Sequence, residues 1–99
     1  MLSASATIPQ IGKKYRNKLQ IANSILKAAG STTGGLSKTK IMYISFLSYA
    51  QVKEYFTFLL ENKLLNYSDE TEKYAPTEMG FNFIKQYGQL AEMMPESVS

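Results

Sequence analysis

The chain contains neither cysteine nor histidine among its 99 residues. The lack of cysteine excludes disulfides and thiolate metal sites. The lack of histidine removes the commonest general base and the commonest neutral metal ligand. Eight carboxylates remain, but no acidic pair lies in an apolar stretch that would raise a pKa. We therefore expect no enzyme activity, no metal site and no cofactor.

Long apolar runs are also missing. No stretch approaches the ~20 apolar residues that are needed to span a bilayer. The first twelve residues, MLSASATIPQIG, lack the early basic residue and the apolar core of a secretory signal. We expect a cytoplasmic protein with no membrane partner.

Acidic residues are absent from the first half of the chain. Residues 1–53 hold eight basic side chains and no acidic one, a formal charge of +8. Residues 54–99 hold three lysines against eight carboxylates, a charge of −5, which leaves the net charge of +3. This asymmetry favours a polyanion as partner of the basic half. The alternative is that folding mixes the two halves and leaves an ordinary solvated surface.

The length of the chain suits a single domain with one core. Residues 1–14 are predicted to be a flexible basic arm. The run Lys13-Lys14-Tyr15-Arg16 at its base either follows DNA phosphates or is a solvated helix start. A helix is expected over about 17–29, ended by Gly30, and Leu36 is expected to form a strand of one or two residues. The helix should bury Leu19, Ile21, Ala22, Ile25, Leu26 and Ala29.

The stretch 38–62 predicts two helices joined by a tight turn. The first runs over about 38–44 and directs Ile41, Met42 and Ile44 inward. The second runs over about 48–62, and Ser48 with Gln51 has the form of a capping box. This arrangement fits a helix-turn-helix, in which the second helix can enter the DNA major groove.

The second of these helices should have a core face of Val52, Phe56 and Leu59, flanked by Tyr55 and Leu60. The opposite face is Ala50, Lys53, Glu54, Thr57 and Glu61. The small side chains of Ala50 and Thr57 permit close approach, and their methyl groups can touch a thymine methyl. Tyr49 has two possible roles. It contacts a phosphate or a sugar, or it packs against the turn as a partly buried aromatic side chain. We favour the second.

Residues 64–76 predict a β-hairpin, because two short strands flank the polar turn 68–72. A hairpin directly after a helix-turn-helix is a wing. A last helix over 77–94, starting at Thr77, follows, and 95–99 form a tail. Its first turns, with Phe81, Phe83 and Ile84, should close the core. Gly80, Ile84, Tyr87, Ala91 and Met94 have heptad spacing, and the predicted dimerisation residues are Ile84, Tyr87, Leu90, Ala91 and Met94.

Three short motifs occur together in the sequence: K-T-K-I-M-Y at 38–43, L-S-Y at 47–49 and Y-A-P-T-E-M-G at 74–80. Over residues 17–90 they resemble an archaeal winged-helix regulator family, which includes small crenarchaeal chromatin-type proteins that dimerise by an antiparallel coiled coil. The resemblance implies DNA binding by a homodimer. Because Glu54 and the acidic wing depart from the family pattern, contacts from the wing are not carried over.

The predicted fold is α+β, mainly α: a winged helix-turn-helix with a C-terminal dimerisation helix. The predicted function is a homodimeric, nucleoid-associated double-stranded DNA-binding protein, a transcription regulator or a small chromatin protein with weak to moderate sequence preference. The alternative is a protein–protein interaction module. The predicted DNA contacts are Lys13, Lys14, Arg16, Lys38, Lys40, Ser48, Tyr49, Ala50, Gln51, Lys53 and Thr57.

Overall fold

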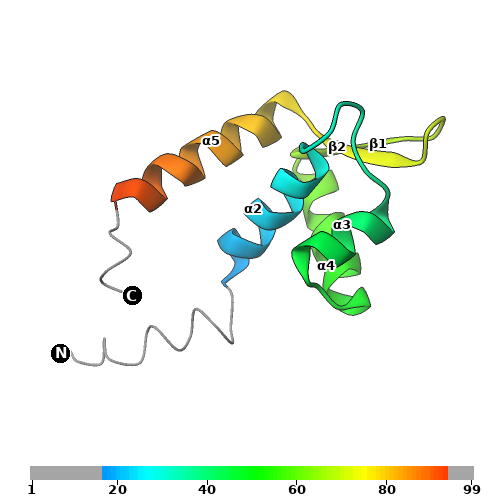
Figure 1. Cartoon of the computed structure of the whole chain (residues 1–99), viewed down its shortest axis with the longest axis horizontal. Helices are drawn as coiled ribbons and strands as arrows, with labels where there is room; N and C mark the ends of the chain where they lie inside the picture. Colours follow the sequence, from blue (N-terminus) through cyan, green and yellow to red (C-terminus); the bar gives the residue numbers. More distant parts are fainter. Residues whose placement is uncertain (1–16, 94–99) are drawn as a thin grey trace.

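A computed structural model of the chain describes residues 17–93 (Figure 1). Three helices surround the core, a two-stranded hairpin follows them, and a last helix packs on the first and then extends away from the body. The mainly helical α+β fold confirms the prediction. The predicted arm, with Lys13, Lys14 and Arg16, as well as Met94 and the tail, lies outside the described residues. The elements are α2 (Lys18–Ala29), α3 (Lys38–Ser45), α4 (Tyr49–Glu61), β1 (Leu65–Ser68), β2 (Lys73–Pro76) and α5 (Glu78–Met93).

Helix α2 begins and ends as its sequence predicts. Asn17 caps it, because its side chain accepts from the Gln20 N–H at 2.8 Å while the Gln20 side chain accepts from the Asn17 N–H at 3.1 Å. The Gly30 N–H donates to the Leu26 carbonyl at 2.9 Å and ends the helix. The apolar stripe is buried except at Leu19, where the prediction is wrong. Leu19 is 56% exposed, because it lies in the first turn at the edge of the stripe.

A residue in the left-handed backbone conformation makes the turn between α3 and α4. Phe46 has φ 57° and ψ 50°, and the Leu47 N–H donates back to the Met42 carbonyl at 3.1 Å. Leu47 is buried and anchors the turn to the core. The Ser48 capping box is confirmed, with bonds of 3.2 and 3.0 Å to Gln51.

The core joins all three helices. The predicted face of α4 is confirmed, since Val52, Phe56 and Leu59 are buried. Isoleucine at position 41 is buried as expected, but the inward prediction for Ile44 is wrong, because that side chain is 52% exposed. Helix α3 is only eight residues long and buries only Ile41 and Ser45, so Ile44 lies to the side of its narrow core face.

The hairpin is antiparallel, and Leu65 pairs with Pro76 while Ser68 pairs with Lys73. The predicted short strand at Leu36 is confirmed as a bridge to β2. The Leu36 N–H donates to the Tyr74 carbonyl at 3.0 Å, and the Tyr74 N–H donates to the Leu36 carbonyl at 2.7 Å. Thus the loop before α3 is fixed to the hairpin.

Helix α5 begins one residue later than expected, because Thr77 precedes it as a cap. The Thr77 hydroxyl oxygen accepts from the Gly80 N–H at 3.0 Å, and the hydroxyl donates to the Lys63 carbonyl at 2.6 Å. Phe83 and Ile84 pack partly buried against the core, as predicted, but Phe81 remains half exposed. No helix between residues 17 and 93 is long and apolar enough to cross a membrane.

Candidate nucleic-acid interface

Three predicted lysines lie on the helix-turn-helix. Lys38 and Lys40 belong to the first turn of α3, and Lys53 lies on α4; all three are exposed. Neither α3 nor the first turn of α4 contains an acidic residue. Glu54 is the first acidic side chain along the sequence. This part of the described surface therefore has positive charge available for a polyanion.

Several polar side chains of α4 and its N-cap are already engaged within the helix. The side chains of Ser48 and Gln51 are bonded to each other's backbone in the capping box. The Thr57 hydroxyl donates to the Lys53 carbonyl at 2.9 Å. The groups of α4 that remain for sequence-dependent contacts are mainly the methyl groups of Ala50 and Thr57 and the Lys53 ammonium.

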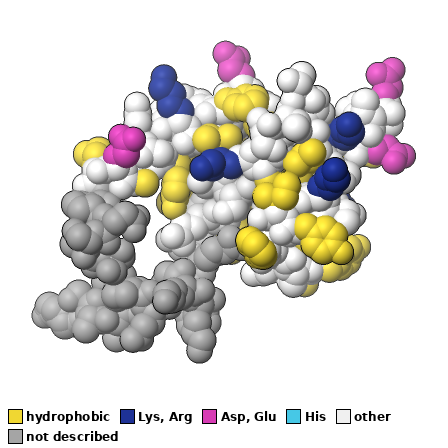
Figure 2. Space-filling model, in the orientation of Figure 1, with side chains coloured by type: hydrophobic (Ala, Val, Ile, Leu, Met, Phe, Trp, Pro, Cys, Tyr) yellow, Lys and Arg dark blue, Asp and Glu magenta, His cyan; other side chains and the backbone are white. Residues whose placement is uncertain are grey.

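The turn between α3 and α4 is surrounded by exposed apolar side chains. Tyr43, Phe46 and Tyr49 are 72%, 87% and 69% exposed, and Ile44 lies beside them in sequence. Figure 2 shows hydrophobic side chains gathered at the lower right, where α3 and α4 lie in Figure 1. The interpretation of Tyr49 as a partly buried residue is therefore wrong. This surface was not predicted from the sequence. It forms because α3 buries only Ile41 and Ser45 and leaves its other apolar side chains largely uncovered.

Lys38 lies over two aromatic rings, which sequence reasoning also missed. Its Nζ is 5.9 Å from the centroid of the Phe56 ring and 6.0 Å from that of Tyr74. The Phe56 and Tyr74 rings meet edge to face at 4.8 Å, and Tyr67 packs on Tyr74 at 4.7 Å. The predicted strand at Leu36 was the available signal, because pairing of Leu36 with β2 places Lys38 near the hairpin.

The order of these elements is helix, turn, capped helix and antiparallel hairpin. A model of the family described as winged helix-turn-helix matches residues 15–95. The chain belongs to the winged helix-turn-helix family. No curated protein matches it. The β1–β2 hairpin is therefore the wing, and a domain of this kind is typical of proteins that bind DNA.

The tip of the wing is acidic. Asp69, Glu70 and Glu72 are exposed, and Figure 2 shows acidic side chains at the right end of the molecule, where the wing projects. Desolvation raises the pKa of Tyr67, and the nearby Glu72 charge raises it further. Burial alone raises the pKa of Tyr74. The winged domain thus has a positive region at α3 and a negative wing tip.

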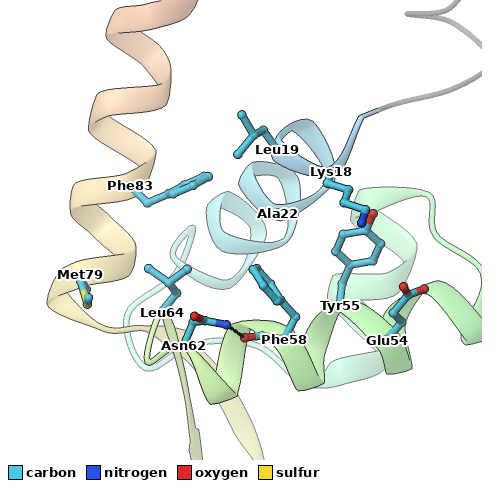
Figure 3. Close-up of a pocket in the computed structure, with 10 residues that line it drawn as sticks. All are labelled: Lys18, Leu19, Ala22, Glu54, Tyr55, Phe58, Asn62, Leu64, Met79 and Phe83. Atoms are coloured by element: carbon cyan, nitrogen blue, oxygen red, sulfur yellow. Dashed lines mark hydrogen bonds between the residues drawn. The ribbon is translucent and has the colours of Figure 1, made fainter.

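An apolar cleft of about 350 Å³ lies on one flank of α4 (Figure 3). Tyr55 and Phe58 form its α4 wall, while Leu19 comes from α2 and Phe83 from α5. The Asn62 side-chain amide donates to the Phe58 carbonyl at 2.8 Å. This flank of α4 is poorly suited to phosphate, so the side that bears Lys53 is the better candidate for contact with nucleic acid.

A second cleft lies between α2 and the outer part of α5. Ile84, Tyr87 and Ala91, which are predicted dimerisation residues, line it together with Asn23. Within the described part of the chain, the Asn23 Oδ1 is buried without a hydrogen-bond partner. Leu90 is 58% exposed on the same helix. The domain thus brings three of the predicted residues to one cleft and leaves Leu90 at the surface.

No cluster of three or more acidic side chains suited to a metal ion is found over residues 17–93.

Proposed function

We propose that this winged helix-turn-helix protein is a homodimer that binds double-stranded DNA with weak to moderate sequence preference. It acts as a transcription regulator or as a small chromatin-associated protein. One observation carries the proposal: exposed Lys38, Lys40 and Lys53 lie on the two helices of the helix-turn-helix, and neither α3 nor the first turn of α4 contains an acidic residue.

In this proposal, α4 enters the major groove by its N-terminal end. Lysines contact phosphates, which gives affinity without sequence information. Because the polar groups of Ser48 and Gln51 are used in the cap, base contacts come mainly from Ala50, Thr57 and Lys53. This limited set favours a weak sequence preference. The full proposed set is Lys13, Lys14, Arg16, Lys38, Lys40, Ser48, Tyr49, Ala50, Gln51, Lys53 and Thr57.

The proposed dimer forms through α5. The exposed Leu90 and the cleft lined by Ile84, Tyr87 and Ala91 support this arrangement, with Met94 as the further predicted contact. The resemblance to the archaeal chromatin-type proteins supports antiparallel pairing of the two α5 helices. Such a dimer would place two copies of α4 on half-sites ~34 Å apart, which is one turn of the DNA.

A salt series tests the electrostatic part of the proposal. If each protomer neutralises about four phosphates, the logarithm of the binding constant should fall against the logarithm of salt concentration with a slope of about −7 for the dimer. The binding constant is measured with a fluorescent duplex at rising salt. A slope near zero rejects phosphate contact as the source of affinity.

The role of α4 is tested by Lys53→Ala, with Lys85→Ala as the matched control. Both variants remove one exposed lysine from a helix, but only Lys53 lies on α4. We expect Lys53→Ala to weaken binding and to reduce the magnitude of the salt slope by about 2 units, because the dimer loses one phosphate contact in each protomer. Lys85→Ala should leave both quantities unchanged. Equal effects of the two variants would reject α4 as the contacting helix.

A second function, recognition of another protein, is favoured by the exposed apolar side chains around the α3–α4 turn. Tyr43, Phe46 and Tyr49 together offer the kind of apolar surface that partner proteins cover. The acidic wing tip also suits a basic partner rather than DNA. Because Tyr49 belongs to both proposed surfaces, direct binding of a labelled DNA duplex separates the two functions: the DNA-binding protein binds the duplex, and a module that recognises only proteins does not.

A further inference from the structure

We infer that Tyr74 and Phe56 are positioning residues that hold the Lys38 ammonium at the junction of α3 and the wing as a phosphate anchor. This inference rests on the proposed DNA binding and adds the means by which one lysine is oriented. It concerns two aromatic residues that lie in the core and in the wing rather than on the DNA-facing surface of α4.

The backbone brings Lys38 to these rings. Two hydrogen bonds pair Leu36 with Tyr74, at 3.0 and 2.7 Å. Gly35, just before, has φ +89°, and a Cβ there would overlap the Tyr74 carbonyl oxygen, so glycine permits this close approach. Lys38 follows Leu36 by two residues and is the first residue of α3. Its side chain therefore starts beside β2, within reach of the Tyr74 ring.

The rings form a fixed support for the ammonium. Phe56, on α4, is only 3% exposed and lies in the hydrophobic core of the domain. Tyr74 meets Phe56 edge to face and is covered on another side by Tyr67. The Lys38 Nζ lies about equally far from both ring centroids, at 5.9 and 6.0 Å. This is within the range in which the negative face of an aromatic ring attracts a cation.

Lys38 nevertheless remains exposed, so the ammonium can meet a phosphate without leaving the rings. A lysine loses considerable rotamer freedom when it is fixed against a partner. Holding Lys38 in place before DNA arrives removes part of this entropic cost from binding. Lys40 has the same charge and lies in the same turn of α3, but no ring contact involves it over residues 17–93.

Lys38 and Lys40 are therefore a matched pair for a double-mutant cycle. We expect Tyr74→Leu to weaken binding of a DNA duplex about two- to five-fold for each Lys38 that contacts DNA, which corresponds to ~0.5–1 kcal/mol for fixing one rotamer-rich side chain on binding. In a Lys38→Ala background the same change should have no further effect. In a Lys40→Ala background it should keep its full effect. Tyr74→Phe, which retains the ring, should bind as the wild type does.

The outcomes separate the inference from the proposed function. If the wild type binds DNA and Tyr74→Leu weakens binding equally in both lysine backgrounds, Tyr74 acts only through the fold and the inference fails. If the wild type does not bind DNA, the proposed function fails and the inference fails with it. Loss of the thermal unfolding transition in Tyr74→Leu would show that the variant does not fold.

A second measurement keeps the inference testable in that case. The protons on the Lys38 Cε of the unmodified protein should be shifted upfield by the ring currents of Phe56 and Tyr74, whereas those of Lys40 should not. Phosphate-backbone binding should leave the Lys38 shift in place, because the ammonium stays on the rings. Equal shifts for the two lysines, or loss of the Lys38 shift on addition of DNA, would overturn the inference.

Discussion

Replacing Gly80 by alanine should loosen the contact between α5 and the start of the wing. Gly80 is buried in the first turn of α5. A Cβ at this position would overlap the Leu64 carbonyl oxygen and lie 3.1 Å from the Pro76 Cβ. The same carbonyl accepts the Thr77 N–H at 3.0 Å. The Leu64 carbonyl belongs to the backbone and cannot rotate away as a side chain can. The start of α5 must therefore move away from the residue that precedes β1.

The expected size of the effect follows from two opposing terms. Alanine favours a helix over glycine by about 1 kcal/mol. Forcing an extra carbon into a packed site costs ~1–3 kcal/mol, and overlap with a backbone atom belongs at the upper end of that range. The net loss is about 2 kcal/mol, which lowers the melting temperature by about 8–16 °C for a domain of this size.

Gly88→Ala is the control, because it lies in the same helix and a Cβ there would meet no atom within 4 Å. We expect it to gain about 1 kcal/mol from helix propensity. Thermal unfolding of both variants is followed at one fixed protein concentration, since the stability of a dimer depends on concentration. Light scattering checks that the mass of each variant is unchanged. If Gly80→Ala is as stable as Gly88→Ala, the proposed overlap at Leu64 is refuted.

Three further predictions concern α4, the wing and α5. Ser48→Ala should lower the free energy of unfolding by ~1 kcal/mol in urea denaturation, because it removes the cap of α4; an unchanged midpoint would contradict this. The raised pKa of Tyr74 means that its contribution to stability is complete below pH 10.0, the ordinary value, and is lost as pH rises through the higher folded value. Tyr74→Phe should make the stability decline less steeply in this alkaline range, and an unchanged decline would exclude Tyr74 as a cause. Leu90→Glu should halve the molar mass measured by light scattering to that of one 11.1 kDa chain, if α5 forms the dimer. A Gln86→Glu control on the same exposed helix should retain the mass of the wild type.

Local signals in the sequence determined most of the secondary structure. The capping box at Ser48 acts over three residues, so the sequence alone marked the start of α4. The structure shows an equally local box at Asn17, which was not predicted from the sequence. Gly30 ends α2 for an equally local reason. The spacing of Val52, Phe56 and Leu59 predicted the buried face of α4, because helical periodicity places them on one side.

Whether the side chains at the edges of these faces are buried or exposed depended on the tertiary structure. Leu19 and Ile44 are apolar and have suitable spacing, yet both are more than half exposed, because the neighbouring elements do not extend over them. The aromatic support of Lys38 joins α3, α4 and β2, and no periodicity within one element encodes it. Sequence alone therefore determined the helices, the turn, the hairpin and the uneven charge. The tertiary structure decided which apolar groups stay at the surface and which lysine is held in place, because both depend on packing between residues distant in the chain.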